Sequence, residues 1–156
     1  MSNSIRRAAA ATLLATVLSS GAAGAHGGAM GVVKERMDLM ERLGDAMKAI
    51  AGMMKDPAAF DGGDLARRAE AIEAHGGDAL TAVFPTGSRE PPSEARAEIW
   101  TEWARFEGLA RDLSAEARRL ADLAAAAPAP TPDVVAAFRA TAQTCGACHK
   151  AFREKK

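Results

Sequence analysis

The chain has 156 residues, 48% of them hydrophobic but only 4% aromatic, so it has room for one modest domain with a largely aliphatic core. With 26% charged residues it is too polar for a protein with several membrane spans, yet it is too apolar for a disordered chain. Twenty basic residues balance twenty acidic ones, so the chain lacks the positive field that nucleic-acid binding usually requires, and we expect no nucleic-acid partner.

The first 25 residues have the pattern of a secretory signal peptide. Arg6-Arg7 precedes an apolar run over residues 8–18, and Ala23-Gly24-Ala25 supplies a cleavage site of small residues. The apolar run is shorter than the ~20 residues that cross a bilayer. We therefore predict that residues 1–25 direct export to the periplasm and are then removed. This leaves a single domain over residues 26–156 without a membrane anchor.

Four segments carry the three-and-four spacing of an amphipathic helix, and none alternates with the period of two that marks a strand. The first helix is predicted over residues 29–55 and ends at Asp56-Pro57, because proline cannot continue a helix. Its apolar stripe comprises Val33, Met37, Met40, Gly44, Met47, Ala51 and Met54. The second helix is predicted over residues 64–80, with Gly76-Gly77 as a point of interruption, and a connector with three prolines follows over 84–92.

The third helix is predicted over residues 94–126, with Ser93 as its N-cap and Trp103 on its apolar stripe. Thr131-Pro132 begins the fourth helix, which extends to about residue 154. The stripe predicted to face the interior on this last helix comprises Val135, Phe138, Ala142, Cys145, His149 and Phe152. These patterns together predict an all-α fold, an antiparallel left-handed four-helix bundle.

The sequence Cys145-Gly146-Ala147-Cys148-His149 is the attachment motif of c-type haem. In this motif two thiols add to the porphyrin vinyl groups and the adjacent histidine ligates the iron. A disulfide would also suit an exported protein, whereas a redox Cys-x-x-Cys usually opens a helix in a strand-containing context that is not predicted here. A zinc site is disfavoured, because it would need two further ligands of comparable quality. We predict one covalent haem c, held through Cys145 and Cys148, with His149 as the proximal axial ligand.

A haem motif near the C-terminus of an exported helical bundle resembles the class II c-type cytochromes. These comprise the cytochrome c′ family, a standard example of the four-helix bundle, and its low-spin cytochrome c-556 relatives. Further residues that carry the resemblance are Arg36-x-x-x-Met40-x-x-x-Gly44, Phe84-Pro85, Ile99-Trp100, Phe106, Lys150, Phe152 and Arg153.

The resemblance implies that Met40, four residues after Arg36, faces the distal side of the haem. A coordinated Met40 thioether would saturate the iron and raise its potential, as suits a one-electron carrier. An uncoordinated thioether would leave a vacant apolar site for nitric oxide or carbon monoxide. Met40 also shares its stripe with three other methionines, and methionine is an adaptable core residue. The residue type alone therefore leaves ligand and core filler both open.

Two arginines have candidate roles at the haem. By resemblance, Arg153 lies near the proximal imidazole or a haem propionate; alternatively it is a solvated cation at a helix C-terminus. Arg36 either pairs with a propionate, since a guanidinium matches carboxylate geometry, or lies on the surface. The candidate cofactor-binding residues are therefore Cys145, Cys148, His149, Arg36, Met40 and Arg153.

We interpret the chain as a periplasmic c-type cytochrome that carries one electron between redox partner proteins. The alternative is a five-coordinate cytochrome c′ that binds nitric oxide or carbon monoxide and protects against nitrosative stress. No catalytic grouping is predicted, so we expect no enzyme. Lys150, Lys155 and Lys156 form either a docking patch for an acidic partner or a solvated end. The resemblance is compatible with a homodimer through the first two helices, whereas charged residues on the outward face of the first helix favour a monomer.

Overall fold

The computed structural model describes residues 28–155, so the predicted signal peptide and its cleavage site lie outside the described residues. Its elements in chain order are α1 (Gly31–Lys55), the 3₁₀ turn η1 (Pro57–Ala59), α2 (Gly62–His75), α3 (Gly77–Ala82), α4 (Glu98–Thr101), α5 (Trp103–Ala125) and α6 (Pro132–Phe152). Over this range the only β contact is an isolated antiparallel bridge between Ala95 and Arg153. The prediction of an all-α fold is confirmed.

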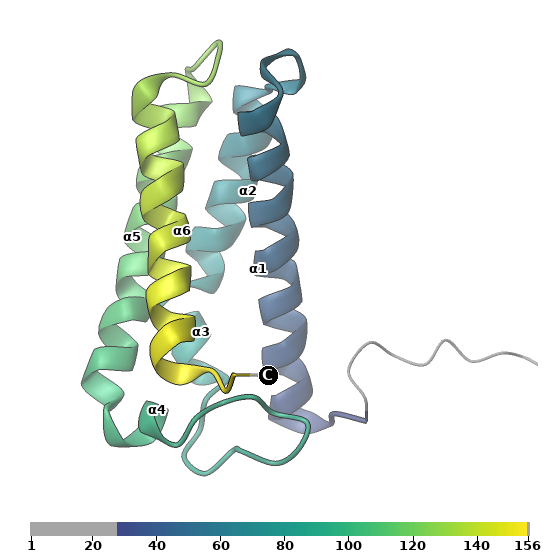
Figure 1. Ribbon diagram of the computed structural model, residues 1–156, viewed down its shortest axis with the longest axis vertical. Helices are drawn as coiled ribbons and strands as arrows, with labels where there is room; N and C mark the ends of the chain where they lie inside the picture. Colours follow the sequence, from purple (N-terminus) through teal and green to yellow (C-terminus); the bar gives the residue numbers. More distant parts are fainter. Residues whose placement is uncertain (1–27, 156) are drawn as a thin grey trace, which may run out of the picture.

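The helices form a four-membered bundle in which α1, α2 with α3, α5 and α6 run as four rods (Figure 1). Helix α5 packs against α2, α3 and α6. Helix α1 packs mainly against α2 and has few direct contacts with α6. The side of the bundle between α1 and α6 is therefore less closely packed than the side between α2 and α5.

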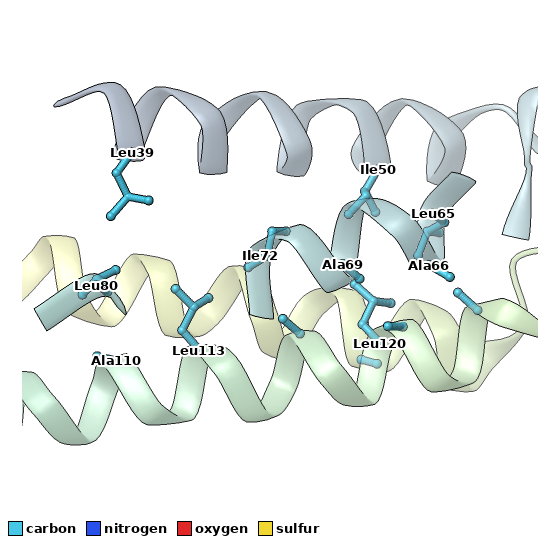
Figure 2. Close-up of a cluster of buried hydrophobic side chains, with 14 of the residues drawn as sticks. Leu39, Ile50, Leu65, Ala66, Ala69, Ile72, Leu80, Ala110, Leu113 and Leu120 are labelled. Carbon is cyan, nitrogen blue, oxygen red and sulfur yellow. The ribbon is translucent and has the colours of Figure 1, made fainter. Parts of the chain in front are cut away.

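The closely packed part of the core is aliphatic (Figure 2). Leu65 and Ile72 of α2 are buried with Leu113 and Leu120 of α5. Each such side chain contributes about 1.5–3 kcal/mol to folding by leaving water. Alanines between them, such as Ala69, are fully buried as well and leave room for the helices to approach each other.

The interruption predicted at Gly76-Gly77 is confirmed, because it separates α2 from α3. Gly77 has a φ of +52°, a left-handed conformation that glycine adopts at low cost. A Cβ atom at Gly76 would lie 3.0 Å from Ser114 of α5. The two helices therefore approach too closely at Gly76 for a side chain. Ser114 Oγ also donates to the Glu73 carbonyl oxygen (3.0 Å) near the end of α2.

The third predicted helix begins later than expected, at Glu98, and the prediction that Ser93 is its N-cap is wrong. Residues 94–97 are not helical, because they lie beside the chain end. The Arg96 N–H donates to the Phe152 carbonyl oxygen (3.0 Å), and the Glu154 N–H donates to the Glu94 carbonyl oxygen (2.9 Å). Tertiary pairing thus overrides a local capping signal.

A break at Glu102 (φ −114°, ψ 38°) then separates α4 from α5. In a continuous helix Trp103 would share a face with Ile99 and Phe106, which are both buried. The break changes the register between them, and Trp103 is 37% exposed. The prediction that Trp103 lies in the core is therefore wrong.

Helices α1 and α6 are rotated relative to their predicted stripes. The buried positions are Val33, Arg36, Leu39 and Ile50 on α1, and Val134, Ala137, Thr141 and Phe152 on α6. Cys145 is partly buried, whereas His149 is exposed and Met40 is intermediate. The predicted stripes assume that every helix is packed against neighbouring helices to the same extent. Helix α1 packs mainly on α2 and α6 mainly on α5, so each turns another face toward the space between them.

Candidate haem site

A cavity of about 540 Å³ lies between α1 and the end of α6, within the size range of cofactor sites. Its walls are Arg36, Met37, Met40, Glu41 and Gly44 of α1, Phe84, Pro92, Ser93, Glu94, Ala95 and Ile99 of the connector and α4, Phe106 of α5, and Cys148, His149, Phe152 and Arg153 of α6. Five of the six predicted cofactor-binding residues line this cavity, and the sixth, Cys145, lies one turn before Cys148 on α6.

The haem motif occupies the last two turns of α6. This helix starts as predicted, with the Thr131 hydroxyl accepting from the Val134 N–H (3.3 Å) and proline at the first position. Cys145 and Cys148 are free thiols on neighbouring turns. Burial and, to a smaller extent, the nearby Cys145 together raise the pKa of Cys148 to about 11. Burial also raises the pKa of Cys145, so both thiols are protonated at neutral pH.

The His149 side chain lies at the cavity wall beside Cys148. Desolvation at this wall lowers the pKa of His149, and the Arg153 charge lowers it further, while Glu94 acts in the opposite direction. A lowered pKa favours the neutral imidazole, which is the form that ligates a metal.

The opposite wall carries thioethers. Met40 and Met37 of α1 both line the cavity, and Gly44 lies one turn beyond Met40. A Cβ atom at Gly44 would meet nothing within 4 Å, so the wall is open at this point. Sequence reasoning placed Met40 by resemblance and did not assign Met37 to the site. Met37 and Met40 lie on the same predicted stripe, and this shared stripe is the sequence signal that could have placed Met37 in the site.

Arg36 is buried (5% exposed), so of its two predicted alternatives the surface position is wrong, while pairing with a haem propionate stays a prediction. Its Nε and Nη2 groups donate to the Val83 carbonyl oxygen (3.1 and 3.0 Å). Nη1 donates to the Ser88 carbonyl oxygen (3.0 Å) and Ser93 Oγ (2.9 Å), and Nη2 to Ser88 Oγ (2.6 Å). The guanidinium also lies 4.1 Å from the ring centroid of Phe84. Burial lowers the pKa of Arg36, against the opposing charge of Glu90.

Arg153 is the C-cap of α6, and its N–H donates to the His149 carbonyl oxygen (3.1 Å). Its side chain is exposed yet lines the cavity. The charge of Arg153 lowers the pKa of His149, which places the guanidinium near the imidazole. Its contact with a haem propionate stays a prediction.

The remaining walls are apolar and aromatic. The Phe106 ring contacts Phe84 with centroids 4.8 Å apart and Phe152 with centroids 5.4 Å apart, in edge-on geometries that are favourable for aromatic pairs. Two cysteines, an adjacent histidine and an apolar wall are the groups and surroundings that hold a c-type haem. The residues present therefore fit this cofactor. Among the described residues no group of His, Cys, Asp and Glu side chains suits a separate metal ion.

The family model for cytochrome c′ matches residues 31–153. The chain belongs to the cytochrome c′ family. A cytochrome c-556 of Agrobacterium tumefaciens (strain II Chrys) is 32% identical over 126 residues, which cover 81% of this chain and 99% of that protein. A cytochrome c′ of Pararhodospirillum photometricum is also 32% identical, over 78% of this chain and 95% of that protein.

The solved cytochrome c′ of Rhodopseudomonas palustris superposes with a TM-score of 0.71 at 28% identity, over 82% of this chain and 99% of that one. The prediction of a four-helix bundle with its haem near the C-terminus is confirmed. Proteins of this family hold one haem c through two cysteines. Cys145 and Cys148 are the two cysteines of this chain, so the predicted cofactor is confirmed. None of the helices within residues 28–155 is long and apolar enough to cross a membrane.

Proposed function

We propose that this cytochrome is a periplasmic one-electron carrier in which His149 and Met40 are the axial ligands. The observation that carries the proposal is that these side chains line one cavity from different helices, His149 from α6 and Met40 from α1. When bound, the haem takes up and releases one electron at its iron. Cys145 and Cys148 tether it, while two protein ligands keep the iron coordination filled in both oxidation states.

The apolar wall supports this role. Phe106 packs against both Phe84 and Phe152, and all three rings line the cavity. Such a wall excludes water from one side of the site. Limited solvent access and a thioether ligand both favour the reduced form and raise the potential of a haem.

A second candidate function, capture of nitric oxide or carbon monoxide, is favoured by one observation. The α1 wall is open beside Met40, since a Cβ atom at Gly44 would have no neighbour within 4 Å. If the Met40 thioether does not ligate, this space is available to a small diatomic ligand opposite His149. The matching relatives include both a cytochrome c-556 and a cytochrome c′ at equal identity, so they favour neither function.

Optical spectra of the oxidised and reduced holoprotein test the two functions. We expect a low-spin spectrum in both states, and we expect Met40→Leu to convert it to a high-spin spectrum because leucine keeps the volume and removes the sulfur. Met47→Leu is the matched control, since Met47 is a partly buried methionine of α1 outside the cavity lining. A high-spin wild-type spectrum that Met40→Leu leaves unchanged would exclude the electron carrier proposed here and support the gas-binding protein.

We further propose that an acidic redox partner docks beside the haem cavity. A second cleft of about 410 Å³ is lined by Arg89, Arg96, Arg153 and Lys155, together with Glu98 and Glu154. It adjoins the haem cavity through Arg153, which lines both. Without Arg6 and Arg7 of the signal peptide, the exported chain has 18 basic and 20 acidic residues and is nearly neutral, so steering of a partner depends on such a local patch. Electron transfer to an acidic partner should then slow as ionic strength rises.

Export and assembly are proposals that rest on the sequence. Intact mass and N-terminal sequencing of periplasmic protein should show a chain that starts near His26, whereas an uncleaved chain would contradict the signal-peptide proposal. Sedimentation of the holoprotein tests the homodimer through α1 and α2 against a monomer.

A further inference from the structure

The Arg36 side chain of α1 fastens the connector between α3 and α4, residues 83–97, to this helix. All five N–H donors of Arg36 have acceptors on Val83, Ser88 or Ser93. Ser88 Oγ in turn donates to the Pro85 carbonyl oxygen (2.8 Å). None of these five bonds goes to a carboxylate, so the burial cost of the Arg36 cation is offset by carbonyls, hydroxyls and the Phe84 ring.

The other end of the connector is fastened to the end of α6. The Arg96 N–H donates to the Phe152 carbonyl oxygen, and the Glu154 N–H donates to the Glu94 carbonyl oxygen (2.9 Å). Ala95 and Arg153 form the antiparallel bridge between these bonds. The connector therefore joins α1 to α6 across one end of the cavity, and direct contacts between these two helices are few.

We propose that Arg36 is a positioning residue that sets the separation between the Met40 wall and the His149 wall of the haem cavity. The two walls belong to helices with few direct contacts, and the five hydrogen bonds of Arg36, here called the Arg36 clamp, link α1 to the connector. Loss of the Arg36 hydrogen bonds should let the connector move away from α1, so that small ligands enter the haem cavity faster. The inference rests on the haem site proposed above, and it applies whether or not the Met40 thioether ligates the iron.

Lysine is the most informative replacement for Arg36. It keeps the positive charge, but its ammonium group has three donors and lacks the planar fork that reaches all of these acceptors. Ser88→Ala removes one acceptor of the clamp from the connector side without changing any charge. Arg42→Lys is the matched control, because Arg42 is an exposed arginine of α1 that does not line the cavity.

The experiment measures carbon monoxide association with the ferrous holoprotein by stopped flow, together with amide hydrogen exchange over residues 84–93. We expect roughly tenfold faster association in Arg36→Lys, since bonds to a charged group are worth about one order of magnitude or more. Ser88→Ala should show a smaller increase, Arg42→Lys none, and exchange over 84–93 should rise in the same order.

Two outcomes would overturn the proposal. If Arg36→Lys and Ser88→Ala lower only the melting temperature, with unchanged association rates and exchange, Arg36 is a purely structural residue. If Arg36→Lys shifts the haem potential while Ser88→Ala behaves as wild type, Arg36 acts on a propionate instead. Should Arg36→Lys fail to fold, Ser88→Ala and Ser93→Ala decide the question. A high-spin wild-type spectrum would overturn Met40 ligation alone, because the same order of association rates is expected in either spin state.

Discussion

The two halves of this bundle are held together by different kinds of interaction. Between α2 and α5, leucine, isoleucine and alanine side chains pack directly against one another (Figure 2). Between α1 and α6 there is a cavity, and the walls are connected through the buried Arg36 and the backbone pairing of residues 94–96 with the chain end. The aliphatic half is held by direct burial of side chains, whereas the walls of the other half are joined mainly through polar links around the cavity.

Loss of the haem should produce the largest difference between the two halves. Replacing both Cys145 and Cys148 with alanine removes the two tethers, and we expect no covalent haem in the purified protein. Without it, α1 keeps mainly its contact with α2, so its amide exchange should rise far more than that of α5. Mass spectrometry measures the haem and hydrogen exchange measures the helices. Equal exchange in α1 and α5 would show that the halves are not distinct.

Truncation of one leucine in each half compares their packing. Leu120 of α5 is fully buried, and Leu120→Ala should cost about 3 kcal/mol of unfolding free energy through lost burial and a residual cavity. Leu43 of α1 is only partly buried, so Leu43→Ala should cost about 1 kcal/mol. Urea unfolding of the two holoproteins gives both values. A larger loss for Leu43→Ala would reverse the comparison.

Two glycines test the same contrast at the backbone. A Cβ atom at Gly76 would lie 3.0 Å from Ser114, so Gly76→Ala should destabilise the protein by about 1–2 kcal/mol through overpacking. Gly52 of α1 lies outside the haem-cavity lining and has open space around the same position, so Gly52→Ala should stabilise α1 by about 0.5–1 kcal/mol through helix propensity. We expect the melting temperature to fall for the first variant and to rise for the second. A decrease in both would contradict the comparison.

The smallest expected effect is electrostatic and lies on the surface of α2. Hydrogen bonds from Arg68 and Arg67 hold the pKa of Asp64 below its ordinary value of 3.8. A lowered folded-state pKa gives stability that is present above pH 3.8 and lost as the pH falls through the lowered value. Asp64→Asn should therefore reduce stability slightly at neutral pH and not at all in strong acid. Unfolding curves of both proteins at several pH values show whether the difference disappears as expected.

The successes and failures of sequence reasoning follow the same division. Stripes with steps of three and four found the helices, and Pro57, Gly76 and Pro132 marked interruptions that the structure confirms, because local backbone chemistry sets them. The stripes of α1 and α6 were rotated, since a cavity takes the place of a neighbouring helix. The prediction of Ser93 as an N-cap was wrong because the residues after it pair with the distant chain end and do not form a helical turn.

The sequence by itself determined the all-α fold, the covalent haem and the family, since helical spacing and the Cys-x-x-Cys-His motif are local patterns. Only the tertiary structure decided that Arg36 is buried against the connector, that Trp103 is exposed, and that Met37 and Met40 share one cavity wall. These outcomes depend on which faces of α1, α5 and α6 meet. Contacts between distant segments fix those faces, and no local pattern encodes them.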